Sequence, residues 1–110
     1  MPLHLPKMVS ACVKGTTLAV QGHAGAAPYG QDLVCAAVTG LVYALAQRLT
    51  ELEQEGAFKG SALIKLTSGE AQISVIPREQ YISQVQENFD LIRSGLTLLQ
   101  HHYPNQIKVN

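Results

Sequence analysis

The stretch DLVCAAVTGLVYALAQRLTELEQEG, residues 32–56, predicts a long helix around which the rest of the chain is organised. Its apolar residues recur at three- and four-residue spacing, the pattern of a helix that buries one stripe of side chains: Val34, Val38, Leu41, Leu45, Leu49 and Leu52. Asp32 stands directly before this period, where an N-cap is expected, and Gly56 follows it. The first half is apolar on nearly every face, so we expect it in the interior, or between a sheet and a partner subunit.

Two predicted β-hairpins flank this helix in the sequence. The first joins strands at residues 8–13 and 16–21 through the turn Lys14-Gly15. The second joins residues 61–67 and 71–75 through Ser68-Gly69, and alternating apolar and polar residues give its second strand a polar face. Both hairpins therefore present one apolar face against which a helix can pack.

A second amphipathic helix is predicted from Tyr81 or Ile82 to Tyr103, where Pro104 stops it. Residues 106–109 alternate as a short last edge strand would. The segment 2–6 contains two prolines, which cannot donate to a ladder, so we expect an edge extension or a frayed arm. The order β-β-α-β-β-α, with or without the final strand, predicts an α+β fold in which two helices pack on a mostly antiparallel sheet. We expect residues 1–110 to form a single domain.

Composition narrows the class of function. The 8 basic residues balance the 8 acidic ones, so the chain lacks the positive patch of a nucleic-acid or anionic-membrane binder. Only 15% of residues are charged and 46% are hydrophobic, which favours burial of apolar surface in a homodimer. Neither a signal peptide nor a membrane-spanning run is expected, so the protein is predicted to be cytoplasmic. In that reducing compartment Cys12 and Cys35 are expected to be free thiols.

The segment Gly22-His23-Ala24-Gly25 and the following Cys35 hold the chemically informative residues. A cysteine attacks as its thiolate, so it needs a proton acceptor within reach and benefits from a helix N-terminus below the sulfur. His23, at a turn of small residues after the second strand, is the candidate base that takes the proton and returns it to the leaving amine. Asp32 is either an auxiliary residue turned toward His23 or only the helix cap.

A helix that begins at Asp32 would place Cys35 in its first turn, beside unpaired backbone amides. The amides of Val34 and Cys35 are then candidate donors to an oxyanion. Residues 24–31 have the composition of a substrate-gripping lid, with Gly25 and Gly30 as hinges around Pro28-Tyr29 and with Gln31 at its end.

These residues also allow simpler interpretations. A histidine after a strand is usually a turn residue, a cysteine in an apolar helix usually behaves as a small hydrophobe, and an aspartate before a helix usually only caps it. The alternatives to a protease are therefore a non-catalytic module that binds a peptide or an assembly partner, and a structural dimer with an inert Cys35.

The motif resembles the signature of the ribosomal-processing cysteine protease family Prp, a small bacterial family formerly carried as a domain of unknown function. Its pattern is a Gly-His-Ala-Gly turn, then a glycine and an aspartate, then Val-Cys-Ala-Ala-Val and a serine. Here it reads as Gly22-His23-Ala24-Gly25, Gly30, Asp32 and residues 34–38. The specific resemblance covers residues 22–38, and element order and length agree beyond it.

The resemblance implies that Cys35 is the nucleophile, His23 the general base and acid, and Asp32 an auxiliary residue. It implies a homodimer that removes the short N-terminal extension of large-subunit ribosomal protein number twenty-seven during ribosome assembly. Thr39 stands where the family carries serine, which keeps the hydroxyl but adds a methyl group at the position implied to contact the lid or the substrate. The two prolines of residues 2–6 also depart from the family's regular first strand.

No cofactor or metal is predicted. His101 and His102 are adjacent on a helix, about 100° apart, so they do not share the one face that a metal pair uses. Cys12 has no partner in a CxxC motif, and Gly22, Gly25 and Gly30 lack the Gly-Lys-Ser/Thr ending of a phosphate loop.

Overall fold

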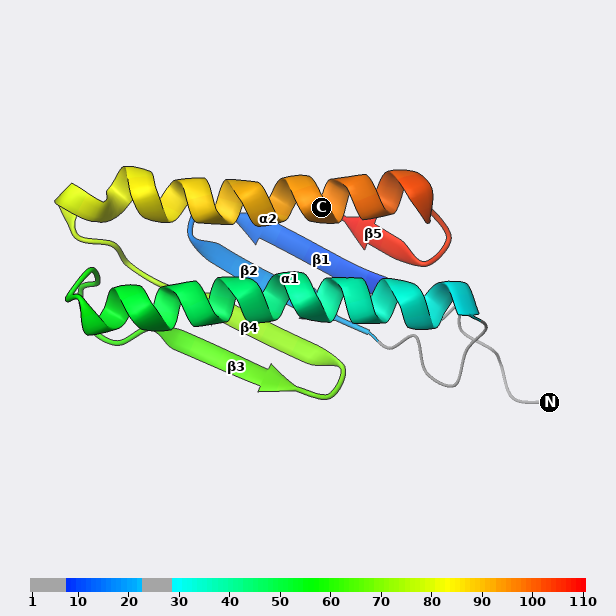
Figure 1. The fold of residues 1–110 in the computed structure, drawn as a ribbon, viewed down its shortest axis with the longest axis horizontal. Coiled ribbons are helices and arrows are strands. Elements are labelled where there is room, and N and C mark those ends of the chain that lie inside the picture. The colour runs from blue at the N-terminus through cyan, green and yellow to red at the C-terminus, as the bar shows by residue number, and fades with distance from the viewer. Residues whose placement is uncertain (1–7, 23–28) are drawn as a thin grey trace.

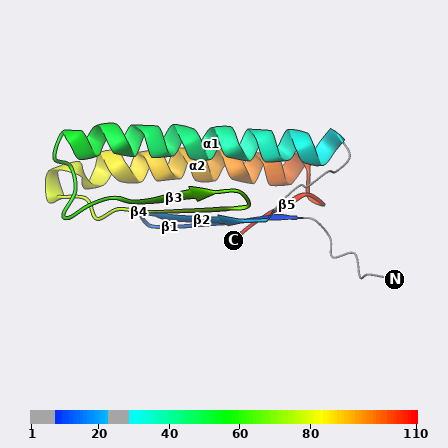
Figure 2. The ribbon, with the colours of Figure 1, turned by 90° about the horizontal axis from the view of Figure 1, so that it is seen from below.

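The sheet has five strands in the order β3-β4-β2-β1-β5, and two long helices cover one of its faces (Figures 1 and 2). This computed structural model describes residues 8–22 and 29–110, with the side chains of 29–32 left out. The predicted α+β class and the strand-strand-helix-strand-strand-helix order are confirmed. The predictions for residues 2–6 and 23–28 lie outside the described residues.

The two hairpins form the centre and one edge of the sheet. β1 (Val9–Lys14) pairs antiparallel with β2 (Thr17–Gln21), and β3 (Leu63–Thr67) pairs antiparallel with β4 (Glu70–Ser74). β2 and β4 join the hairpins in an antiparallel pair, so β3 lies at the edge. Gly69 turns the second hairpin at a φ of 80°, a left-handed conformation that glycine adopts without strain.

The last strand, left open by the sequence, is present. β5 (Ile107–Val109) lies beside β1 and runs parallel to it, which makes it the other edge of the sheet. The backbone amide of Asn110 donates to the carbonyl of Ala11 at 2.8 Å and extends this pairing to the last residue. A short 3-10 helix, η1 (Glu79–Tyr81), precedes α2 (Ile82–His102).

The core lies between the sheet and the helix layer. Alternate strand residues face it, such as Val9, Ala11 and Val13 of β1, while Ser10 and Lys14 on the other face are exposed. Helix α1 contributes the predicted stripe, except that Leu41 is only partly buried, and Val42 and Ala46 are buried in addition. Helix α2 contributes the buried residues Val85, Phe89, Ile92 and Leu96.

Helix α1 (Tyr29–Gln54) begins three residues before the predicted cap. Asp32 is therefore the fourth residue of the helix, and the prediction that it is the N-cap is wrong. Tyr29, Gly30 and Gln31 form the first helical turn rather than the end of a lid loop, which corrects that prediction as well. The apolar period marks where the helix becomes buried, whereas the backbone is already helical at Tyr29.

The outer surface of the helix layer retains large apolar side chains. Leu33 of α1 is 58% exposed, and Leu91 and Leu98 of α2 are 68% and 59% exposed. Between the latter two, Gly95 allows close approach of the helices, because a Cβ there would lie 3.1 Å from the Leu41 side chain. In the first half of α1, one side packs on the sheet. The opposite, apolar side is not covered by any of the described residues.

Length and composition alone would allow residues Leu33–Gln54 of α1 to cross a membrane, contrary to the expectation from sequence. Within the fold, this helix buries one stripe against the sheet, as the core helix of a two-layer domain does. We therefore interpret the apolar residues of α1 as those of a core helix and not of a membrane span.

Candidate active site

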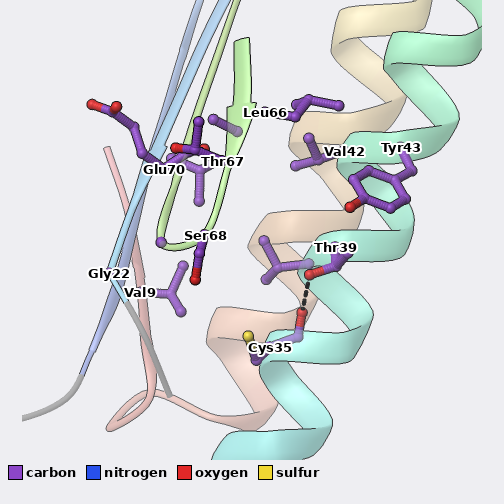
Figure 3. A pocket seen from close by; sticks show the side chains of 14 residues that line it. Val9, Gly22, Cys35, Thr39, Val42, Tyr43, Leu66, Thr67, Ser68 and Glu70 are labelled. Carbon is purple, nitrogen blue, oxygen red and sulfur yellow. Dashed lines mark hydrogen bonds between the residues drawn. The ribbon is translucent and has the colours of Figure 1, made fainter. Parts of the chain in front are cut away.

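A cavity of about 430 Å³ lies between α1 and the turn of the β3–β4 hairpin (Figure 3). Cys35, Thr39 and Tyr43 line it from α1, together with two core valines of that helix. Residues 66–71 close the opposite side, and Val9, Val20 and Gly22 form the side toward the central strands. Its volume is that of ordinary ligand sites, about 300–1,000 Å³.

The thiol of Cys35 faces this cavity. Figure 3 shows the sulfur on the side of α1 that is turned toward the sheet, and Cys35 is half-buried and free of any disulfide. Cys12 is the other free cysteine and is also half-buried, but it alternates with the core residues of β1 and so belongs to the sheet face without helices. Both thiols are free, as predicted, and Cys35 lines this cavity whereas Cys12 does not.

Cys35 lies in the second turn of α1, one turn further than predicted. In a helix that begins at Tyr29, the amides of Val34 and Cys35 are bonded to carbonyls four residues earlier, so they are not free oxyanion donors. This corrects the oxyanion prediction for both residues. Unpaired amides occur only in the first turn, and the dipole effect also weakens beyond it.

Thr39, one turn after Cys35, is held by a local hydrogen bond. Its Oγ1 donates to the carbonyl oxygen of Cys35 at 2.7 Å, the back-bond that threonine makes within helices. The threonine lines the cavity while its hydroxyl proton is committed to the helix. Only the lone pairs of this hydroxyl are left for a ligand.

Gly22 is required by a close backbone approach. A Cβ on this residue would lie 2.3 Å from the carbonyl oxygen of Met8, and its φ of 112° disfavours any L side chain. Its amide donates to the carbonyl of Gly69 at 3.0 Å, which ties the end of β2 to the β3–β4 turn. Gly22, the residue before His23, is therefore held at the cavity by its hydrogen bond to Gly69.

Gly22→Ala is expected to destabilise the protein by at least about 3 kcal/mol, since it adds both backbone strain and a steric overlap. Chemical denaturation followed by circular dichroism measures this change. Gly15→Ala is the matched control, because Gly15 also has a positive φ of 56° but nothing lies within 4 Å of its Cβ position. It should cost about 1–2 kcal/mol. Equal losses for the two variants would contradict the close-approach argument.

The structure brings together part of the predicted site. Gly22, Cys35 and Thr39 line one cavity. His23, Ala24 and Gly25 lie outside the described residues, so the pairing of His23 with Cys35 stays a prediction. Gly22 is the residue before His23 in the chain.

Sequence reasoning missed several residues of the cavity. Tyr43 follows Cys35 by eight residues, so helical periodicity alone could have placed it near the same face. Leu66, Thr67, Ser68 and Glu70 come from the second hairpin, and nothing local indicates that its turn meets α1. Within residues 8–22 and 29–110, no three His, Cys, Asp or Glu residues are grouped in a way that could hold a metal.

Comparisons with known proteins agree with this arrangement. The family model of the cysteine protease Prp matches residues 8–108. A comparison with curated proteins finds no match.

Solved structures share the fold over nearly the whole chain. The chain is similar to the crystal structure of SMU.848 from Streptococcus mutans, with 27% identity, a TM-score of 0.68, and coverage of 94% of this chain and 93% of that one. It is similar in fold to the essential ribosomal processing protease Prp from S. aureus in complex with a substrate peptide, with 18% identity, a TM-score of 0.70, and coverage of 94% and 96%. The same S. aureus protease with a covalently linked product peptide gives 19% identity, a TM-score of 0.68, and coverage of 94% and 97%.

The α+β fold, the cavity-facing thiol and the family match together define the class of the protein as a cysteine protease. Within that class, the chain belongs to the Prp family. The resemblance read from residues 22–38 is thereby confirmed over almost the full length of the chain.

Proposed function

We propose that this protein is an endopeptidase of ribosome assembly that cuts the short N-terminal extension from large-subunit ribosomal protein number twenty-seven. The observation that carries the proposal is the thiol of Cys35 in a cavity of ligand size, in a chain of the Prp family. The S. aureus relative, described as a ribosomal processing protease, supports the substrate class. The proposed setting is the bacterial cytoplasm, where ribosomes are assembled.

In the proposed mechanism, His23 takes the proton of the Cys35 thiol, and the thiolate attacks the carbonyl carbon of the scissile peptide bond. A bond forms between sulfur and carbon, and the carbonyl oxygen becomes an oxyanion. When the carbon–nitrogen bond breaks, His23 returns the proton to the leaving amine and an acyl-thioester remains. Water, deprotonated by His23, then hydrolyses the thioester and releases the thiol.

The direct test incubates the protein with a synthetic peptide that spans the extension junction of the ribosomal protein from the same organism. Mass spectrometry should find cleavage at one bond. Residues on both sides of that bond should be recovered as two products whose masses sum to the peptide plus water. Binding of the peptide without cleavage would contradict the proposal and favour a non-catalytic module.

We also propose that two copies of the chain form a homodimer. The exposed apolar side chains of the helix layer, Leu33, Leu91 and Leu98, support this proposal, as does the low charged fraction of 15%. Light scattering during size-exclusion chromatography should give twice the chain mass of 11.9 kDa. Leu91→Glu should shift the protein toward the monomer, and Leu63→Glu on the sheet edge should not. A monomeric wild type would contradict the proposal.

A further inference from the structure

The Cys35 cavity continues into a second hollow along α1. The two share Tyr43 of α1 and Leu66 of β3 as lining residues (Figure 3). Beyond this pair, the second hollow is lined by Ala46, Gln47 and Thr50 of α1 and by Ile64 of β3. Together they form one groove, which we call the α1–β3 groove.

The groove exists because the edge strand is incompletely covered. On β4, the helix-facing residues Ala71 and Ile73 are buried under the helix layer. On β3, the neighbouring Ile64 is only half-buried and Leu66 is 38% exposed, although both face the helices. Among the described residues β3 pairs with β4 alone, so its outer backbone edge offers donors and acceptors to an added strand.

The dimensions of the groove suit an extended peptide. From Cys35 to Thr50 the helix advances fifteen residues, which is about 22 Å at 1.5 Å per residue. An extended chain spans that distance with about six or seven residues at 3.3 Å each. The walls at Tyr43 and Leu66 are apolar, whereas Gln47 and Thr50 beyond them are polar. Peptides commonly bind in this way, with main-chain bonds to a strand edge and alternate side chains in pockets.

We propose that the α1–β3 groove holds about six residues of the peptide substrate on one side of the scissile bond, and that Tyr43 and Leu66 select an apolar side chain there. The inference rests on the proposed function, because the groove begins at the Cys35 thiol. The occupant is a peptide and not a second copy of the chain, since the groove is continuous with the cavity of that thiol and matches the length of an extended segment.

The test measures binding in the Cys35→Ala background, where the substrate is not consumed. The probe is the fluorescein-labelled junction peptide of the ribosomal protein, in full length and in two forms shortened from either end up to the residues next to the junction. Fluorescence anisotropy gives each Kd. One of the two shortened peptides should bind about tenfold more weakly, because it no longer fills the groove.

Tyr43→Ala and Leu66→Ser should each weaken binding of the full-length peptide by about fivefold to tenfold. Neither variant should affect the peptide that lacks the groove segment. Leu63→Ser is the matched control, because Leu63 lies on the same strand and is 54% exposed, but alternates onto the other sheet face. Its Kd for every peptide should equal that of the parent.

Distinct results overturn the inference. If Leu66→Ser and Leu63→Ser act alike, or if Tyr43→Ala weakens all peptides equally, the groove does not hold the segment. If Tyr43→Ala changes the mass of the protein in light scattering, a second copy occupies the groove. If the wild type cleaves the peptide but no groove variant matters, this inference fails and the proposed function stands. If no peptide is bound or cleaved, both fail.

Discussion

Cys35→Ala is expected to lower the rate of cleavage of the junction peptide by at least about 10⁴-fold, because in the proposed mechanism it removes the sulfur atom that forms the covalent intermediate. The sulfur faces the α1–hairpin cavity, so no neighbouring thiol can take its place there. Stability should change by less than about 1 kcal/mol, since Cys35 is only half-buried and alanine is a good helix former. Cleavage is followed by chromatography of the products, and stability by chemical denaturation.

Cys12→Ala is the matched control for that experiment. Cys12 is also half-buried and free, but it lies on the sheet face opposite the helices. Its replacement should leave the cleavage rate within about twofold of the wild type, because surface substitutions away from the site have small effects. Retained activity in Cys35→Ala, or loss of activity in Cys12→Ala with the fold intact, would contradict the assignment of Cys35.

Phe89→Ala is expected to destabilise the protein by about 3–5 kcal/mol, the range found when a buried phenylalanine is truncated. Phe89 is completely buried at the middle of the α2 stripe, between Val85 and Ile92, and it is among the largest fully buried side chains of the described chain. Since small domains are stable by about 5–15 kcal/mol in total, the variant should unfold at much lower denaturant concentration.

Glu87→Ala provides the comparison for Phe89→Ala. Glu87 lies two residues earlier on the same helix and is exposed, so its replacement should change stability by less than about 0.5 kcal/mol. Both variants are measured by urea denaturation followed at the helix signal in circular dichroism. A Phe89→Ala loss no larger than that of Glu87→Ala would contradict the packing of α2 on the sheet.

The order of elements could be predicted because each element carries its own signal. The apolar stripes of α1 and α2 and the alternation of the four hairpin strands are local patterns. The start of α1 could not be read in this way, because Tyr29, Gly30 and Gln31 are helical without contributing to the apolar period. The error moved Cys35 from the second turn into the first and gave Asp32 a capping role that the helix start excludes.

In the candidate site, too, the residues that belong to a local pattern could be predicted, and those placed by long-range contacts could not. Gly22, Cys35 and Thr39 were found because they belong to one contiguous motif. The need for glycine at position 22 comes from the Met8 carbonyl, fourteen residues away, and the sequence holds no sign of that contact. Leu66 joins Tyr43 only because β3 takes the sheet edge beneath α1. Such long-range pairings depend on topology rather than on local pattern.

The proposed role of Cys35 as the nucleophile of a peptidase can be tested by covalent labelling. The most direct measurement treats the protein with a chloromethyl ketone built on the extension sequence up to the junction, and locates the adduct by peptide mass mapping. One adduct per chain is expected, on Cys35, and none should form with Cys35→Ala. An adduct on Cys12, or the absence of any adduct in a protein that still cleaves the junction peptide, would contradict it.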